Sequence, residues 1–183
     1  MPEIIAIANQ KGGVGKTTTS VNLAAALHAT GKKTLLVDLD TQGNATTACG
    51  IDKSNLEVSV YDLFVGAATA DAALVHPEAN GFWVLPANKD LMAAEIQLLE
   101  FREREFQLKQ ILAGISPRFD YVLIDTPPSM NILTINALAA SDGVIIPVQC
   151  EYYALEGLTG LLETINKIQE KINPKLTIKG VLR

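Results

Sequence analysis

The segment "NQKGGVGKTTTS", from Asn9 to Ser20, holds three glycines, two lysines and a run of hydroxyl side chains. The residues before it, Glu3 to Ala8, form a short apolar run that predicts a buried strand. After it, apolar residues recur at helical spacing from Lys16 to Thr30, and Gly31 suits a helix end. The sequence therefore opens with a strand, a glycine-rich turn and a helix, in that order.

This order of elements is suited to binding phosphate. Glycines let the backbone turn tightly and aim its N–H groups inward, and the following helix directs its positive end to the same place. The ordinary phosphate loop reads G-x-x-x-x-G-K-S/T, and Gly15, Lys16 and Thr17 supply its ending, although Gln10 stands where the first glycine belongs. We expect Lys16 to reach the β- and γ-phosphates, Thr17 to hold Mg²⁺ and Thr18 to add a hydroxyl contact. A glycine-rich turn with a solvated lysine is the alternative, and the strand and helix on either side argue against it.

Three aspartates come at the ends of apolar runs that predict strands. Asp38 and Asp40 follow the run 34–37, and Asp125 closes the run 121–125. Ligands of an open parallel sheet gather at the carboxyl ends of its strands, so we expect these carboxylates beside the glycine loop. Asp125 fits the Walker B role of assisting Mg²⁺ through a water. Each aspartate alone is equally well explained as a helix cap or turn residue, but three at one edge favour a functional site.

The remaining pattern alternates strands with helices. Further strands are predicted at 82–85, 143–148 and 176–183, a short helix at 58–66, and longer helices at 88–113, 131–140 and 155–172. This alternation predicts one α/β domain over residues 1–183, with a mostly parallel sheet and helices on both faces. The last strand pattern ends without a following turn or helix, so we expect the domain to be truncated at its carboxyl end.

The helix predicted over 88–113 carries a charged segment. Within it, Glu100 and Arg104, and Glu105 and Lys109, are four residues apart. Pairs at this spacing support each other on a helix surface. We interpret the segment as a solvated helix face rather than a partner site.

Composition narrows the possible functions. The chain has 183 residues, 48% of them hydrophobic, which is enough for one well-formed core. No run approaches the ~20 apolar residues of a membrane helix, and the start lacks the features of a secretory signal, so we expect a cytoplasmic protein with no stable membrane insertion. Cys49 and Cys150 have no metal or disulfide spacing and are expected to be reduced. The net charge of −5 argues against a uniformly basic nucleic-acid surface, but not against a local basic patch.

Four segments together resemble a known family. "KGGVGKTT" (11–18) resembles the deviant Walker A motif of the ParA/MinD/nitrogenase-iron-protein class of P-loop ATPases, whose mark is the additional lysine, here Lys11. "LLVDLDTQGNAT" (35–46) and "DYVLIDTPPS" (120–129) are similar to the second and third motifs of that class. "IIPVQCEYYALEGL" (145–158) is typical of the ParA/Soj chromosome-partitioning branch. The resemblance runs from residue 4 to the end of the chain.

The resemblance implies a P-loop NTPase that binds ATP and Mg²⁺ and works as a dimer. It assigns nucleotide binding to Lys11, Gly12, Gly13, Val14, Gly15, Lys16, Thr17 and Thr18. Two subunits close around two ATP molecules, and Lys11 reaches the phosphates held by the other subunit, while Lys16 serves its own nucleotide. Asp40 positions or activates the attacking water, and Asp38 supports Mg²⁺ through water. Hydrolysis, slow and stimulated by a partner, then dissolves the dimer.

The resemblance also implies partners. A ParA/Soj-type ATPase segregates chromosomes or plasmids with a ParB-type centromere-binding protein and associates with the nucleoid. The family's adenine contacts and the basic residues that bind DNA non-specifically come after the last strand, beyond Arg183, so a chain ending there lacks them.

Four other functions are alternatives, and one of them is a related ParA-like ATPase that positions another cargo. A MinD-like regulator of division-site placement would need a carboxy-terminal amphipathic helix for lipid, and none is present in this sequence. An iron protein of the nitrogenase type would need a cluster cysteine soon after the Walker B strand, where this chain has "TPPSMN". The last alternative is a domain that binds nucleotide without turnover, which steady-state phosphate release would distinguish.

Overall fold

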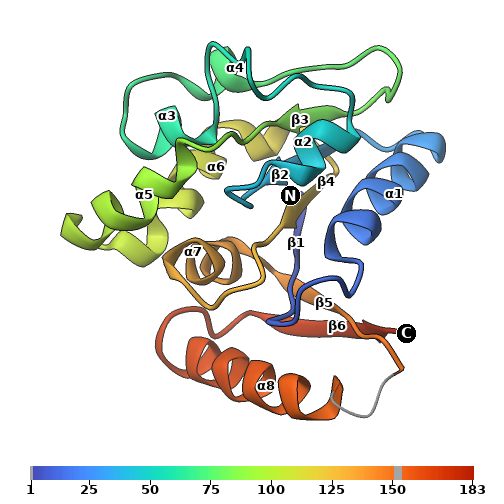
Figure 1. Cartoon of the computed structure of the whole chain (residues 1–183), viewed down its shortest axis with the longest axis vertical. Helices are drawn as coiled ribbons and strands as arrows, with labels where there is room; N and C mark the ends of the chain where they lie inside the picture. Colours follow the sequence, from blue (N-terminus) through green and yellow to red (C-terminus); the bar gives the residue numbers. More distant parts are fainter. Residues whose placement is uncertain (1, 151–153) are drawn as a thin grey trace.

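The computed structural model describes the backbone of residues 2–150 and 154–183 and the side chains of residues 2–150 and 158–183. It contains a six-stranded sheet in the order β3-β2-β4-β1-β5-β6, in which each neighbouring pair is parallel (Figure 1). The strands are β1 (Glu3–Ile7), β2 (Thr34–Asp38), β3 (Trp83–Leu85), β4 (Tyr121–Asp125), β5 (Gly143–Pro147) and β6 (Thr177–Leu182). The predicted α/β class and the predicted strands are confirmed.

The helices connect these strands in the alternation expected of a parallel sheet. They are α1 (Lys16–Ala29), α2 (Asn44–Ala48), α3 (Val60–Phe64), α4 (Ala70–Ala73), α5 (Leu91–Gln97), α6 (Gln107–Ile115), α7 (Ile132–Ala140) and α8 (Ala154–Lys171). Three 3₁₀ turns add η1 (Leu98–Glu100), η2 (Arg104–Phe106) and η3 (Ser116–Arg118). Residues 151–153, in the middle of the segment typical of the ParA/Soj branch, lie outside the described residues.

The two faces of the sheet bury alternate side chains of the same strands. On β1, Ile5 and Ile7 pack with Ala24 of α1, whereas Ala6 belongs to the cluster on the opposite face. That larger cluster takes side chains from α3, α5, α6, α7 and α8. Successive side chains of a strand point to opposite faces, so strands buried on both sides are continuously apolar. Figure 1 shows α1 and α7 on opposite sides of the central strands.

The prediction of one continuous helix over residues 88–113 is wrong. The structure instead has α5, η1, an irregular turn in which Glu103 takes a φ of 52°, η2 and α6. The buried Asn136 of α7 replaces helical bonds at this break: its Nδ2 donates to the Arg104 carbonyl at 2.8 Å, and its Oδ1 accepts from the Leu108 N–H at 3.0 Å. The predicted pairing of Glu100 with Arg104 is therefore absent, and Arg104 Nε lies 3.2 Å from Glu105 Oε1.

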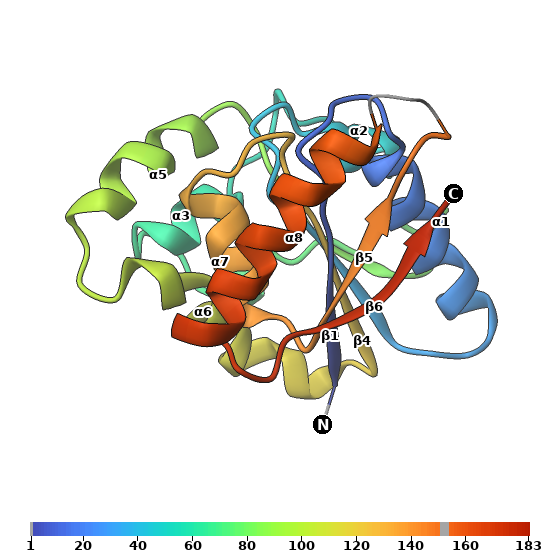
Figure 2. The ribbon, with the colours of Figure 1, turned by 90° about the horizontal axis from the view of Figure 1, so that it is seen from below.

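Strands β1, β2 and β4 end at the same level of the sheet, at the end where the functional residues were predicted. Asp125 pairs in register with Asp38 on one side and with Ile7, the last residue of β1, on the other. Figure 2 shows β5 and β6 running toward the sheet edge that lies away from the start of the chain. The glycine loop after β1 and the carboxylates of β2 and β4 therefore lie together at the carboxyl ends of the strands.

Two further expectations concern cysteines and membranes. Cys49 is buried and Cys150 is exposed, and both are free thiols. Burial, together with the nearby charge of Asp38, raises the pKa of Cys49 to about 11, so this thiol is unreactive at neutral pH. None of the helices in the described ranges combines the length and apolarity needed to cross a bilayer.

Candidate nucleotide site

The glycine loop is held at its start by the Asn9 side chain and turns into α1 through a left-handed residue. Asn9 Nδ2 donates to the Pro147 carbonyl at 2.7 Å, and Asn9 Oδ1 accepts from the Lys11 N–H at 3.0 Å. Gly15, the N-cap of α1, has a φ of 91°, a conformation that side chains with a Cβ rarely adopt. Val14 is buried, whereas Gly12 and Gly13 are exposed. The loop is thus a fixed turn with an open outer surface.

The amide groups of this turn face no protein acceptor. Within the described part of the chain, the backbone N–H groups of residues 12–18 donate no hydrogen bond to another protein group. The first turn of α1 also contains no acidic side chain that would neutralise the positive helix end. A run of unsatisfied donors at the start of a 14-residue helix is an anion site, and its length suits several phosphate oxygens.

Lys16 supplies a buried cation at this place. Its side chain is only 7% exposed, and its Nζ donates to the Lys11 carbonyl at 3.1 Å. Burial lowers the pKa of Lys16, and the charges of Asp125 and Asp40 act in the opposite direction. A buried ammonium in so few contacts is poised for a further anionic partner.

Thr17, Ser20 and Asp125 form a hydroxyl–carboxylate cluster below the loop. Asp125 accepts from Thr17 Oγ1 at 2.7 Å through one oxygen and from Ser20 Oγ at 2.9 Å through the other. Burial raises the pKa of Asp125 to about 7, and the charge of Asp38 adds to that effect. A nearby divalent cation would favour the ionised carboxylate and so offset this burial.

These residues fit a magnesium ion that is shared with a ligand. No group of three or more His, Cys, Asp or Glu side chains among the described residues is arranged to hold a metal. Mg²⁺ in phosphate sites is commonly held by one or two protein oxygens together with substrate phosphates and waters. The Thr17 hydroxyl and the Asp125 carboxylate provide that small set of protein oxygens.

Asp38 is wholly buried and is occupied by the loop that follows β2. One carboxylate oxygen accepts from the Asp40 N–H at 3.0 Å. The other accepts from the Thr46 N–H at 2.8 Å and from Thr46 Oγ1 at 2.7 Å. Burial raises the pKa of Asp38 to about 6, against the effect of these hydrogen bonds. Its metal role stays a prediction, and the contacts seen here shape the loop that carries Asp40.

Asp40 lies at the open end of that loop. Its carboxylate accepts from the Gln42 N–H at 2.9 Å, and its side chain is 7% exposed. Gly43, which follows at a φ of 58°, passes so close to the Ala87 carbonyl that a Cβ would lie 2.8 Å from its oxygen. The close packing at Gly43 therefore fixes the position of Asp40 near Lys16.

The other predicted loop residues are in place as well. The Lys11 side chain is partly buried, and its carbonyl accepts from Lys16 as described above. Thr18 is exposed on the first turn of α1, and its carbonyl accepts from Asn22 Nδ2 at 2.8 Å. Gln149, which follows β5, donates to the Gly13 carbonyl at 2.9 Å.

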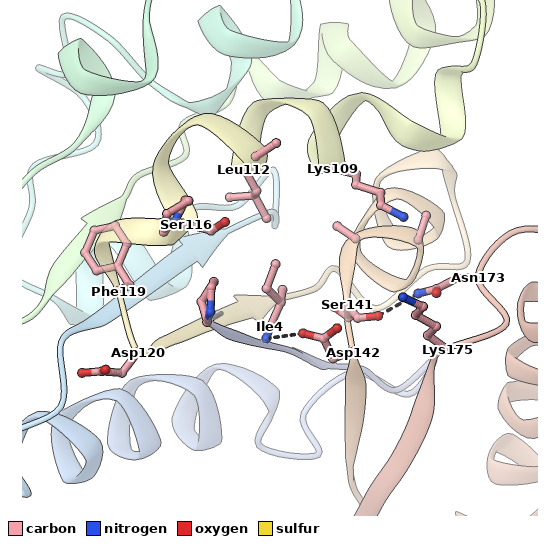
Figure 3. Close-up of a pocket in the computed structure, with 15 residues that line it drawn as sticks. Ile4, Lys109, Leu112, Ser116, Phe119, Asp120, Ser141, Asp142, Asn173 and Lys175 are labelled. Carbon is pink, nitrogen blue, oxygen red and sulfur yellow. Dashed lines mark hydrogen bonds between the residues drawn. The ribbon is translucent and has the colours of Figure 1, made fainter.

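A cavity of about 740 Å³ lies at the opposite end of the sheet (Figure 3). Its polar lining groups serve the fold itself: Asp142 accepts from the Ile4 N–H at 2.9 Å, and Asn173 Nδ2 donates to the Ser141 carbonyl at 2.7 Å. Lys109, Lys175, Asp120 and Asp142 also line it, so the lining carries charges of both signs.

Comparison with known proteins agrees with this site. Residues 2–178 match a family model described as an AAA domain. The chain is 53% identical over 182 residues to the sporulation initiation inhibitor protein Soj of Bacillus subtilis, covering 100% of this chain and 72% of Soj. It is 47% identical over 181 residues to the chromosome partitioning protein ParA of Caulobacter vibrioides, covering 98% of this chain and 68% of that protein.

The chain belongs to the ParA/Soj family of P-loop ATPases. A solved structure described as cobyrinic acid a,c-diamide synthase from Mycobacterium smegmatis, with an ATP analog and magnesium, matches this ParA/Soj-family chain with a TM-score of 0.96 and 46% identity. The match covers 100% of the chain and 74% of that structure. The predicted family and fold are confirmed.

Several residues of the site were missed in the sequence. Ser20 is four residues after Lys16 and so lies on the same helix face, a spacing that would have pointed to it. Thr46 was quoted within a motif but given no role, although it binds both Asp38 and, through its Oγ1 acceptor at 2.9 Å, the Ala87 N–H. The Asn9 and Gln149 side chains donate to backbone carbonyls more than 100 residues away in the sequence. No sequence pattern points to such contacts.

Proposed function

We propose that this chain binds ATP with Mg²⁺ at the glycine loop and hydrolyses it to ADP and phosphate. The observation that carries the proposal is the run of unsatisfied N–H groups over residues 12–18, beside the buried ammonium of Lys16. The related structure solved with an ATP analog and magnesium supports ATP as the ligand. Residues 11–18 are the proposed nucleotide-binding segment.

Each residue of the site has a proposed task. The loop amides and Lys16 bind the phosphates and stabilise charge that develops as the terminal phosphoryl group leaves. Thr17 and Asp125 would hold Mg²⁺, which neutralises phosphate charge when bound. Asp40 orients or deprotonates the attacking water, and Asp38 positions Asp40 through its hydrogen bonds to the loop.

The proposed activity works as a dimerisation switch. In the closed dimer, Lys11 of each subunit contacts the phosphates bound by the other, so that the γ-phosphate stabilises the pair. Hydrolysis removes that contact and the subunits separate. The proposed setting is chromosome or plasmid partitioning with a ParB-type partner, near the nucleoid. The name of the ParA relative supports the chromosome-partitioning part of this proposal.

A synthase is the second candidate, because the M. smegmatis structure carries that description. A MinD-like role in division-site placement also uses the same ATP chemistry. A synthase would need its acid substrate for sustained turnover, whereas the proposed switch hydrolyses ATP without an added acceptor. A slow basal rate of phosphate release with Mg²⁺ and ATP alone therefore favours the switch.

The test compares the unaltered chain with Lys11→Ala. We expect the unaltered chain to release phosphate and to form a dimer with ATP in light scattering. Lys11→Ala should bind ATP within about threefold of the unaltered affinity by calorimetry but remain monomeric, because it loses the cation that is proposed to serve the other subunit. Lys32→Ala, at an exposed lysine beyond α1, is the matched control and should dimerise normally. A stable ATP-dependent dimer of Lys11→Ala would contradict the cross-subunit role.

A further inference from the structure

Glu95 brings a carboxylate from α5 to the edge of the nucleotide site. On α5, Leu91 and Ala94 are buried and Met92 and Ile96 are exposed, while Glu95 lies between these two faces and is partly buried. Burial raises the pKa of Glu95, the hydrogen bond from Asn131 acts in the opposite direction, and the charge of Asp40 adds to the effect of burial. No motif in the sequence points to this residue.

The Glu95 carboxylate is engaged by Asn131, the N-cap of α7. Asn131 Nδ2 donates to Glu95 Oε1 at 2.8 Å. Asn131 Oδ1 accepts from the Leu133 and Thr134 N–H groups, each at 3.1 Å. The helix amides need an acceptor, so the Asn131 oxygen must face α7 and its NH₂ group must face Glu95. The side chain is therefore fixed from both sides.

Asn131 ends the segment 126–131, which connects Asp125 to α7. Thr126 Oγ1 donates to the Ile7 carbonyl at 2.8 Å and holds the start of this segment against β1. Thr134 Oγ1 donates to the Ser129 carbonyl at 2.7 Å and holds its middle. The contact with Glu95 is a further attachment, which joins the segment to α5.

We propose that Glu95 is a positioning residue for ATP turnover, which acts by holding Asn131 and with it the 126–131 segment beside Asp125 and Asp40. The inference rests on the proposed ATPase function. Glu95 itself touches neither the loop amides nor the phosphate-binding lysine in this structure; it sets the path of the chain that leaves the Walker B strand. Loss of the contact should slow turnover while ATP binding is retained.

The test exchanges donor and acceptor across the contact. Asn131→Asp keeps an acceptor for the α7 amides, so the helix stays capped, but it places two carboxylates face to face. Glu95→Ala removes the acceptor altogether. In the double variant Glu95→Gln with Asn131→Asp, the new amide can donate to the new carboxylate. Glu95→Gln alone keeps an acceptor for Asn131 and is the conservative control.

We expect kcat for phosphate release to fall about tenfold in Glu95→Ala and in Asn131→Asp, with KM for ATP within about threefold of the unaltered value. The double variant should recover to within about threefold of the unaltered kcat, because the two changes act through one contact. Glu95→Gln should stay within about twofold. A double variant as slow as Asn131→Asp, or unchanged kcat in both single variants, would overturn the proposal.

A second measurement needs no nucleotide. Amide hydrogen exchange at Leu133 and Thr134, whose N–H groups donate to Asn131 Oδ1, should be about tenfold faster in Glu95→Ala than in the unaltered chain, and should stay near the unaltered rate in Glu95→Gln. Unchanged exchange in Glu95→Ala would overturn the positioning role. If the unaltered chain releases no phosphate, the proposed function fails, and the exchange data still decide whether the contact holds the segment.

Discussion

Lys16→Ala should weaken ATP binding at least about 100-fold, or roughly 3 kcal/mol, in calorimetry with Mg²⁺ present. Lys16 is a buried cation beside the open loop amides, and we propose that its ammonium is the direct counter-charge for the terminal phosphates. Its removal leaves Asp125 and Asp40 with less compensating charge, which further opposes the approach of an anion. The amides of residues 12–18 remain, so weak residual binding is expected rather than none.

The control for this prediction is Lys32→Ala, which removes a lysine from an exposed position and should leave ATP affinity within about twofold. Thermal unfolding of both variants without nucleotide shows whether Lys16→Ala is folded. ATP affinity unchanged in a folded Lys16→Ala protein would refute the phosphate-loop assignment.

Asp40→Ala should lower the rate of phosphate release by about 10²–10⁴-fold while ATP affinity stays within about threefold. Asp40 is on the loop after β2 and its charge acts on Lys16, so we propose that it acts on a water without being a phosphate ligand. ATP-dependent dimerisation should persist, because the proposed dimer depends on Lys11 and on an intact γ-phosphate. Single-turnover phosphate release and light scattering measure the two effects separately.

The variant Asp40→Asn separates two possible tasks of Asp40, which are to supply a negative charge and to accept the loop hydrogen bond from Gln42. The asparagine oxygen can still accept from the Gln42 N–H, so the loop should keep its path. We expect Asp40→Asn to be as slow as Asp40→Ala, because an amide is a poor proton acceptor for water. Normal hydrolysis in Asp40→Asn would remove the carboxylate from the mechanism and leave Asp40 with a structural task.

The parts of the site that follow from local pattern and strand topology were predictable. A glycine loop between a strand and a helix carries its own geometry, and parallel strands place their carboxyl ends at one edge, which is why Asp38 and Asp125 pair in register. The family motifs pointed to the same residues. The phosphate loop and the level strand ends followed from periodicity, spacing and residue type, whereas the roles expected of Lys11 and Asp40 came from the family resemblance.

The parts that depend on side chains meeting across the fold were not predictable. The helical pattern over 88–113 is interrupted because Asn136, some 28 residues beyond Leu108, takes over the backbone groups at the break. Glu95 and Asn131 are 36 residues apart, and neither lies in a pattern that suggests the other. Periodicity identifies which positions face the core, but it does not say which polar side chain satisfies a buried backbone group.

The most direct test is a crystal structure of the chain with magnesium and a non-hydrolysable ATP analog. The account predicts the terminal phosphoryl group over residues 11–18, within hydrogen-bond distance of the loop amides and of Lys16 Nζ, with the metal beside Thr17 and Asp125. A nucleotide bound elsewhere, for example in the cavity at the opposite end of the sheet, would contradict it.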